Sequence, residues 1–375
     1  MRVIRLKGEG FRNLQSLDFC PDENVNVICG RNAQGKTNLL EALWLFGGRG
    51  SFRSAKDSDF IAFGAERLKL ELEFVSQGRE QHAGIEISPQ GKLITLGRVK
   101  VERMADLSEA FRAVVFAPDH LELVKQGPAE RRRFLDSCLS AVYPKYAKVL
   151  DSYERILKQR GMLLSELRGK RVQINEMLDV WDEGLVQYGG YIAHTRARYV
   201  QRLAGYAQEV YQGLSSSAEK FSAVYKSGSG KFAPGASRSE VTAQLAKLVS
   251  ESRGEDLRTA RTNVGPHRDD FEVRLDGQSA RSFGSQGQQR SCVLALKLAE
   301  CKILQDAAEQ QPIVLLDDVM SELDSTRRAQ LLQALVGRQV IITCCAEDGF
   351  RLMQGGAVFG MSGGVLSAKQ SVVAP

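Results

Sequence analysis

The sequence predicts an α/β fold in which a parallel sheet forms the core, accompanied by an antiparallel subdomain and an inserted helical domain. Short apolar runs at 24–30, 313–318 and 340–343 are typical of buried parallel strands. Residues 68–74 alternate apolar and charged side chains, and a turn then leads to GIEI at 84–87, which predicts antiparallel strands. The 89 residues between Pro144 and Pro234 contain no proline and carry apolar side chains at helical spacing.

The length of 375 residues is more than one hydrophobic core usually organises, so we expect two domains. We predict a head made of residues 1–144 and 263–375, and a helical arm domain inserted between them at 145–262. The Gly- and Ser-rich stretch 226–237 predicts a flexible loop near the end of the arm.

Composition places the chain among ordinary globular proteins, with 43% apolar and 26% charged residues. There is no early apolar segment and no run of about 18 apolar residues, so we predict neither secretion nor membrane spanning. The seven cysteines form no CxxC pair, which favours buried thiols in a reducing cytoplasm over disulfides or a zinc site.

The segment GRNAQGKT follows the first apolar strand, matches the GxxxxGK[ST] pattern and precedes a helix-compatible run. Such a loop binds phosphates because its backbone N–H groups and the following helix N-terminus point toward the anion. We expect Lys36 to reach the β- and γ-phosphates of ATP, and the Thr37 hydroxyl to bind Mg²⁺. The predicted nucleotide loop comprises Gly30, Arg31, Asn32, Ala33, Gln34, Gly35, Lys36 and Thr37.

An acidic pair, Asp317 and Asp318, ends the second apolar strand. A phosphate loop requires a carboxylate at the end of a buried strand to support the metal, so we assign that role to Asp317. We expect Asp318 to orient the attacking water or to accept its proton. Lys36 and Asp318 are therefore the predicted catalytic residues, and Thr37 and Asp317 the predicted metal-binding residues.

A second predicted anion site lies at 282–290, where SFGSQGQQR precedes a long apolar-periodic helix. Ser285 and Gly287 place a hydroxyl and an unobstructed backbone at the start of that helix. With the loop, the acidic pair and SELD at 321–324, the chain resembles ABC-type ATPases. That resemblance implies an ATP-dependent homodimer in which Ser285, Gly287 and Gln288 of one protomer cover the γ-phosphate bound by another.

Five segments narrow the resemblance to the RecF family of SMC-like ABC-type ATPases. They are FRNL at 11–14, VVFAPDHLELVKQGPAERRRFLD at 114–136, RTNVGPHRDDF at 261–271, FGSQGQQR at 283–290 and LLDDVMSELD at 315–324. The resemblance implies ATP-dependent binding to duplex DNA and gapped single-strand junctions. It also implies work with RecR and RecO to load RecA in DNA repair, replication restart and the SOS response. Arg12 and Asn13 are expected near the phosphates.

Two positions depart from the transporter branch of these ATPases. Thr343 stands where the transporters have a switch histidine, and Asp318 stands where they usually have glutamate. Because a shorter carboxylate must reach the same water, we predict slow hydrolysis.

Local charge predicts a DNA-binding surface that the total charge of +6 does not. Residues 131–171 contain eleven Lys or Arg against four acidic residues, a net charge of +7. Basic side chains along a helical arm would contact phosphates without identifying bases, with Lys158, Arg160, Lys170 and Arg171 as candidates. The alternative for the distal part of this basic segment is a helix face that contacts only solvent.

The segment GPHRDD at 265–270 holds one histidine and two aspartates, but its place at a domain junction favours a structural role over metal binding. Two other functions remain open. A transporter nucleotide-binding subunit would share the loop and signature but lacks the helical arm. An SMC-like DNA clamp would use ATP only for dimerisation, and its turnover would distinguish it.

Overall fold

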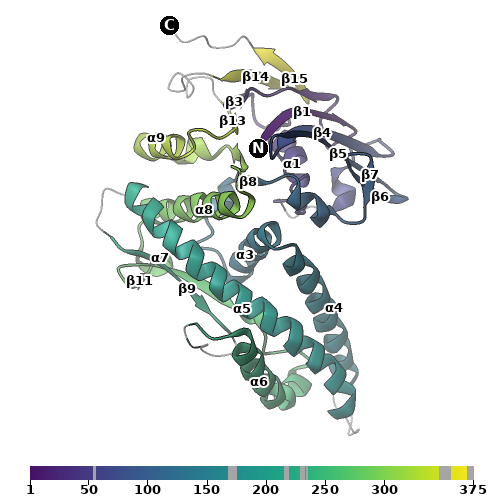
Figure 1. The fold of residues 1–375 in the computed structure, drawn as a ribbon, viewed down its shortest axis with the longest axis vertical. Coiled ribbons are helices and arrows are strands. Elements are labelled where there is room, and N and C mark those ends of the chain that lie inside the picture. Colours follow the sequence, from purple (N-terminus) through teal and green to yellow (C-terminus); the bar gives the residue numbers. More distant parts are fainter. Residues whose placement is uncertain are drawn as a thin grey trace. The chain divides into compact units, whose positions relative to one another are not determined.

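Contacts divide the chain into two compact units in the computed structural model (Figure 1). Unit 1 comprises residues 1–121 and 297–375, and unit 2 comprises residues 122–296. The structure describes residues 1–53, 56–167, 175–214, 219–228, 233, 235–345 and 356–369. The unit boundaries lie outside the 145–262 predicted for the arm, because segments on both sides of that range pack with it.

The first sheet of unit 1 is the antiparallel subdomain. Its strand order is β2-β1-β4-β5-β6-β7, and β4 pairs with β5 from Leu68 opposite Ile87 to Ser76 opposite Arg79. The alternation predicted at 68–74 is confirmed, since Leu68, Leu70, Leu72 and Phe74 are all fully buried. The strands are β1 (Arg2–Glu9), β2 (Leu17–Phe19), β4 (Leu68–Ser76), β5 (Arg79–Ser88), β6 (Gly91–Leu96) and β7 (Val99–Val101).

The second sheet of unit 1 holds the predicted parallel strands, in the order β15-β14-β3-β13-β12-β8. All neighbours are parallel except β14 and β15. In this register Asp317 lies opposite Thr343, and Cys344 lies opposite Cys29, so the carboxyl ends of β3, β13 and β12 are adjacent. The strands are β3 (Val25–Cys29), β8 (Ala113–Phe116), β12 (Ile313–Asp317), β13 (Val340–Cys344), β14 (Ala357–Ser362) and β15 (Val365–Lys369).

One hydrophobic core joins the two sheets of unit 1 through helix α1 (Lys36–Leu45). Leu39 and Leu43 of α1, Phe74 of β4 and Leu315 of β12 belong to this core and are fully buried. The start of α1 is therefore anchored beside the strand ends. Short elements complete the unit: η1 (Asp57–Phe60), η2 (Met104–Glu109), α2 (Pro118–Leu121), η4 (Val319–Glu322) and α9 (Ser325–Ala334).

Unit 2 contains the predicted helices together with a three-stranded sheet of order β11-β10-β9. Strand β9 (Phe221–Lys226) lies within the range predicted for the helical arm, so the insertion contains a strand besides its helices. This strand pairs antiparallel with β10 (Asp270–Leu275), so ladder hydrogen bonds join residues assigned by sequence to the arm and to the head. The remaining elements are α3 (Pro128–Val142), α4 (Pro144–Leu167), α5 (Asn175–Leu214), α6 (Arg238–Thr259), η3 (Pro266–Arg268), β11 (Gln278–Ser279) and α7 (Ala280–Phe283).

Helix α8 (Gln286–Ala308) begins in unit 2 and ends in unit 1. Most of the loop predicted at 226–237 lies outside the described residues. Five cysteines are buried, as predicted, whereas Cys20 and Cys345 are exposed. Within the described ranges, no helix is both long enough and apolar enough to cross a membrane.

Candidate nucleotide-binding site

The predicted phosphate loop follows β3 directly and ends at the start of α1. Gly35 has φ of +108°, a conformation that L side chains rarely adopt. A Cβ at Gly35 would lie 2.8 Å from Leu14 Cδ2 and 3.0 Å from Asn13 Oδ1. The loop therefore requires glycine at this position, and the FRNL segment packs against it.

The side chain of Lys36 turns back onto the loop. Its Nζ donates hydrogen bonds to the carbonyl oxygens of Gly30 at 2.5 Å and Arg31 at 2.9 Å, and lies 3.8 Å from Cys345 Sγ. Lys36 is only 7% exposed, so its ammonium group is held inside the loop at the end of β3. This is the position from which a lysine can bind a phosphate oxygen.

The two predicted metal-binding residues are brought together although 280 positions separate them. Thr37 Oγ1 donates to Asp317 Oδ1 at 2.9 Å, and Thr343 Oγ1 donates to the same oxygen at 2.9 Å. Burial raises the pKa of Asp317 above its ordinary value, while the two hydroxyls oppose that shift. A hydroxyl and a buried carboxylate form a donor set of the hard oxygen ligands that Mg²⁺ prefers.

Thr343 also organises the second acid. Its Oγ1 accepts a hydrogen bond of 3.0 Å from the backbone N–H of Asp318, which has φ of +51°. The fully buried Thr343 hydroxyl therefore bridges the two aspartates. Both hydrogen bonds of this hydroxyl are therefore made within the site, one to each aspartate.

A cavity of about 570 Å³ lies over the loop. Arg12, predicted near the phosphates, lines it: Nε lies 2.6 Å from Glu41 Oε2, and the buried Nη2 has no hydrogen-bond partner among the described residues. Such an orphaned guanidinium nitrogen suits a phosphate oxygen. The lining is Arg12, Asn13, Asn32, Ala33, Gln34, Gly35, Lys36, Thr37, Asn38, Arg53, Asp59, Ile61, Phe63, Asp317, Asp318 and Thr343.

Sequence reasoning missed Arg53 and the apolar pair Ile61 and Phe63. Arg53 Nη1 donates to Asn38 Oδ1 at 3.1 Å. Phe63 is fully exposed at the edge of the cavity, which is unusual for a large aromatic side chain. No spacing rule links these residues to the loop, because the fold brings them to it from a separate segment.

The predicted signature residues lie at the start of α8, as expected. Ser285 N donates to Gln288 Oε1 at 2.7 Å, and Gln288 N donates to Ser285 Oγ at 3.2 Å. This reciprocal cap fixes the first turn of the helix. Buried Gln289 supports it by donating to the carbonyl oxygen of Gly284 at 3.1 Å, and Ser285 is exposed.

Fewer basic side chains of the segment 131–171 are free to contact DNA than its net charge predicts. Arg131 pairs with Asp270 at 2.6 Å, and Arg132 donates to the carbonyl oxygen of Asp269 at 2.7 Å. The prediction that Arg160 contacts DNA is wrong, because its side chain is fully buried and paired with Asp182. Lys145, Lys148, Arg155 and Lys158 are exposed, whereas Lys170 and Arg171 lie outside the described residues.

The GPHRDD segment has the contacts of a structural element. His267 Nδ1 lies 2.7 Å from Tyr153 Oη, and Nε2 lies 2.9 Å from the carbonyl oxygen of Thr262. Burial lowers the pKa of His267 to about 4. Buried Asp269 accepts a hydrogen bond of 2.7 Å from Gly228 N. Among the described side chains, no cluster of three or more potential metal ligands occurs.

Known proteins resemble the chain over nearly its whole length. Residues 2–363 match the family described as RecF/RecN/SMC N terminal domain. The DNA replication and repair protein RecF of Heliobacterium modesticaldum is 41% identical over 350 residues, 92% of each chain. A solved structure of the recombination mediator protein RecF-ATPrS in the RecFOR pathway is 32% identical, with a TM-score of 0.91 over 98% of both chains.

A more distant solved structure shares the fold. The Smc head domain of Pyrococcus furiosus, with an extended coiled coil and bound to the C-terminal domain of ScpA, has a TM-score of 0.53 at 15% identity. The match covers 99% of this chain and 96% of the Smc head domain chain. The predicted α/β fold of an ABC-type ATPase head with an antiparallel subdomain is confirmed.

Proposed function

The chain belongs to the RecF family of DNA replication and repair proteins. We therefore propose that it binds ATP, forms a homodimer when ATP is bound, and binds DNA during repair. One observation carries the nucleotide part of this proposal: the hydrogen bond of 2.9 Å between Thr37 Oγ1 and Asp317 Oδ1. It joins the phosphate loop to the acidic strand end, as magnesium-dependent nucleotide binding requires. The RecF relative solved with ATPrS supports the choice of nucleotide.

Each residue of the site has a distinct task in this proposal. The loop N–H groups and Lys36 bind the phosphates, and Arg12 adds its orphaned Nη2. Asp318 orients the attacking water and accepts its proton. Ile61 and Phe63 offer an apolar edge on which a purine can stack.

Thr37 and Asp317 would hold Mg²⁺, whose charge would offset the developing negative charge on the phosphates. The fit is chemical: a buried carboxylate with a raised pKa lacks an ionic partner among the described residues, and a cation would stabilise its ionised form. Thr343 keeps that carboxylate oriented through its own hydrogen bond.

The signature residues Ser285, Gly287 and Gln288 would complete the site of a second protomer. Ser285 is exposed and its helix turn is fixed by the reciprocal cap, so the hydroxyl is ready to bind an anion. A two-fold symmetric dimer would bury two nucleotides. Dimerisation would then depend on ATP.

For the DNA partner we propose duplex DNA and single-strand gaps flanked by duplex. Family membership supports this choice, and so do the exposed Lys145, Lys148 and Lys158 of α4. RecR and RecO would be its protein partners, and loading of RecA in repair, replication restart and the SOS response its outcome. The solved relative described in the RecFOR pathway supports this placement.

Sedimentation of the protein with and without ATP and a gapped duplex tests the proposal. We expect a dimer only with ATP, and DNA in the dimer fraction. Lys36→Arg should impair hydrolysis, whereas Asp318→Asn should retain ATP and trap the dimer because the water is no longer activated. A monomer under all conditions would contradict the proposed dimer, and undiminished hydrolysis by Asp318→Asn would remove Asp318 from its role.

A further inference from the structure

Unit 2 contains a second cavity, of about 850 Å³, where α6 ends and the chain returns toward β10. Three arginines line this cavity, and none of the described residues that line it is acidic. We propose that this cavity binds a phosphate group of the DNA backbone through Arg261 and Arg268, which rests on the DNA binding proposed above. The lining is Gly228, Arg258, Thr259, Arg261, Asn263 and Arg268.

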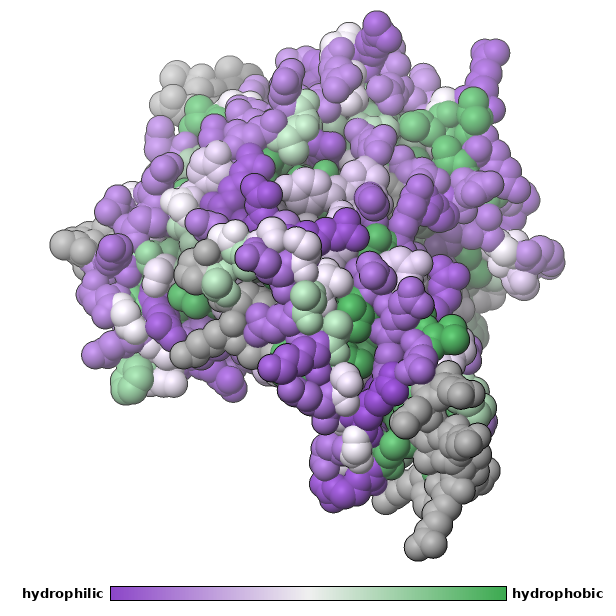
Figure 2. All heavy atoms as spheres, turned by 60° about the horizontal axis from the view of Figure 1, so that its bottom comes forward, coloured by the Kyte–Doolittle hydropathy of each residue, from purple (hydrophilic) through white to green (hydrophobic). Residues whose placement is uncertain are grey.

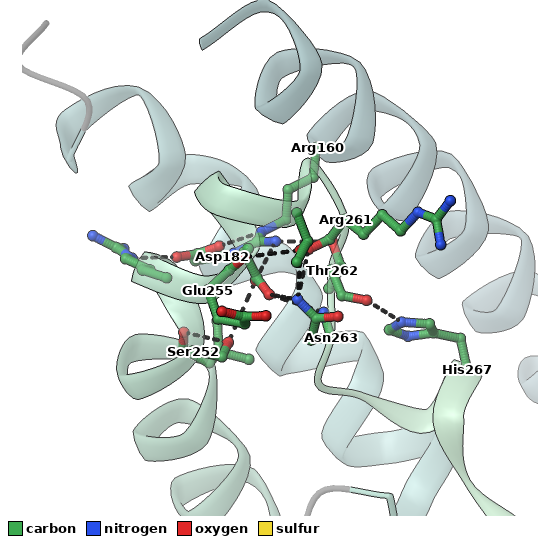
Figure 3. Close-up of polar contacts among 12 residues, drawn as sticks. Arg160, Asp182, Ser252, Glu255, Arg261, Thr262, Asn263 and His267 are labelled. Atoms are coloured by element: carbon green, nitrogen blue, oxygen red, sulfur yellow. Dashed lines mark hydrogen bonds and ion pairs between the residues drawn. The ribbon is translucent and has the colours of Figure 1, made fainter. Parts of the chain in front are cut away.

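The two proposed phosphate ligands retain unused donors. Arg261 is exposed, and its guanidinium points away from the polar network beside it (Figure 3). Arg268 is also exposed and gives one long hydrogen bond, from Nη2 to the carbonyl oxygen of Thr262 at 3.4 Å. Neither has an acidic partner among the described residues. Arg258 differs, because it pairs with Glu255 at 2.6 Å.

A buried network holds the turn that carries Arg261 (Figure 3). Arg160 bonds to Asp182 at 2.6 Å, to Asp256 at 2.8 Å and to the Thr262 hydroxyl at 2.8 Å. Asp256 Oδ1 in turn accepts hydrogen bonds from Asn263 N and Nδ2 at 2.9 and 2.8 Å. The backbone on both sides of Arg261 is therefore fixed, which reduces the entropy lost when its side chain binds a ligand.

The part of the lining formed by Gly228 and Arg268 is fixed as well. Gly228 N donates to buried Asp269 Oδ1 at 2.7 Å. A Cβ at Gly228 would lie 2.8 Å from both Cβ and O of Arg268, so this close approach of two segments requires glycine. The position of Arg268 is thus set by backbone packing as well as by its own hydrogen bond.

The chemistry of the lining selects a phosphate. A guanidinium presents N–H donors in a planar fork that matches two oxygens of a phosphate, and it stays charged at every physiological pH. A cavity that is open and offers mainly cationic donors binds the nucleic-acid backbone without identifying bases. The face of the molecule in Figure 2 is predominantly hydrophilic, with small separate apolar patches. The cavity lining itself contains no large apolar side chain among the described residues, which disfavours an apolar protein partner.

Charge removal at the cavity tests the proposal. We would compare the native chain with Arg261→Gln/Arg268→Gln, measuring binding to a fluorescent gapped duplex across a series of salt concentrations. Each lost phosphate contact should reduce the salt slope by about one and weaken binding roughly tenfold near ~0.1 M salt. The double variant should retain ATP binding, which shows that unit 1 is folded, and the native circular dichroism of its helices, which shows that unit 2 is folded.

Two control variants make the result specific. Arg198→Gln/Lys247→Gln removes the same charge from exposed positions of unit 2 that lie outside both the cavity and α4, and should change the slope much less. Arg261→Lys/Arg268→Lys keeps the charge and should keep most of the slope. An unchanged slope in the glutamine variant, or an equal loss in the first control, would overturn the assignment.

A final comparison identifies the source of the phosphate. Inorganic pyrophosphate, titrated at constant ionic strength, should displace DNA weakly from the native chain. Displacement at low micromolar pyrophosphate that disappears in the glutamine variant would show a small-anion site and overturn the DNA assignment. If the native chain binds no duplex at all, both the proposed DNA-binding function and the proposed role of the cavity are wrong. If the native chain binds DNA and the glutamine variant binds it equally well, only the proposed role of the cavity is wrong.

Discussion

The nucleotide site and the Arg160 network bury carboxylates to the same extent but satisfy them differently. Asp317 and Asp182 are each 6% exposed. Asp317 accepts hydrogen bonds from two neutral hydroxyls, whereas Asp182 pairs with Arg160 and with Arg253, both at 2.6 Å. An equally buried carboxylate is thus left short of positive charge in one region and fully paired in the other.

This difference separates a binding site from a structural one. A buried charge is stable only with a partner, so a carboxylate held by hydroxyls alone is poised to accept a cation. The paired carboxylates of the Arg160 network have no such capacity, and they hold α4, α5 and α6 together.

Removal of the shared arginine should have the largest effect. Arg160→Met would leave Asp182 and Asp256 buried with less positive charge, and should lower the free energy of unfolding of unit 2 by about 3–5 kcal/mol. Urea denaturation with hydrogen exchange at α4 and α6 would measure this. Arg258→Gln, which breaks an exposed pair, should change stability by at most about 0.5 kcal/mol. Equal effects of the two variants would contradict a structural role for the network.

Acid should weaken the same region through His267. Its folded pKa of about 4 lies below the ordinary 6.5, so the folded state favours the neutral ring. The stability is fully present above about pH 6.5 and is lost as the pH falls toward 4, by up to ~3 kcal/mol. His267→Gln should flatten this dependence in denaturation curves recorded between these values. Identical pH profiles for the native chain and the variant would show that His267 is not responsible.

At the nucleotide site, loss of the carboxylate charge should have the opposite effect on stability. Asp317→Asn keeps an acceptor for Thr37 and Thr343 but removes an ionised group that burial disfavours, so the nucleotide-free protein should become more stable. Magnesium-dependent ATP hydrolysis should fall by about 10- to 100-fold. Calorimetry and a phosphate-release assay measure the two effects. A destabilised variant would place Asp317 with the structural carboxylates.

The smallest expected effect concerns the apolar edge of the cavity. Phe63→Ala should raise the dissociation constant of ATP about tenfold, because stacking of an aromatic side chain on a base contributes about 1–3 kcal/mol. Val99→Ala removes an exposed apolar side chain of unit 1 that lies outside the cavity and should leave ATP affinity unchanged. Equal affinities for the native chain and Phe63→Ala, measured by fluorescence titration, would show that the base does not stack there.

Sequence reasoning succeeded where a pattern is local. The spacing from Gly30 to Thr37 and the alternation at 68–74 are read within one turn or one strand, and both occur in the structure as predicted. It was less accurate where a residue's environment comes from distant segments. Arg160 belongs by sequence to a run of basic residues, yet Asp182 and Asp256 from two other helices enclose it.

Short stretches of the chain were enough to predict the phosphate loop, the acidic strand end and the signature turn, and five such stretches together carried the family resemblance. The three-dimensional contacts were needed to show that Thr37 contacts Asp317, that Phe63 lines the cavity over the phosphate loop and that Arg261 projects from a fixed turn. The physical reason is that periodicity determines local conformation, whereas burial and charge pairing depend on contacts between segments hundreds of positions apart.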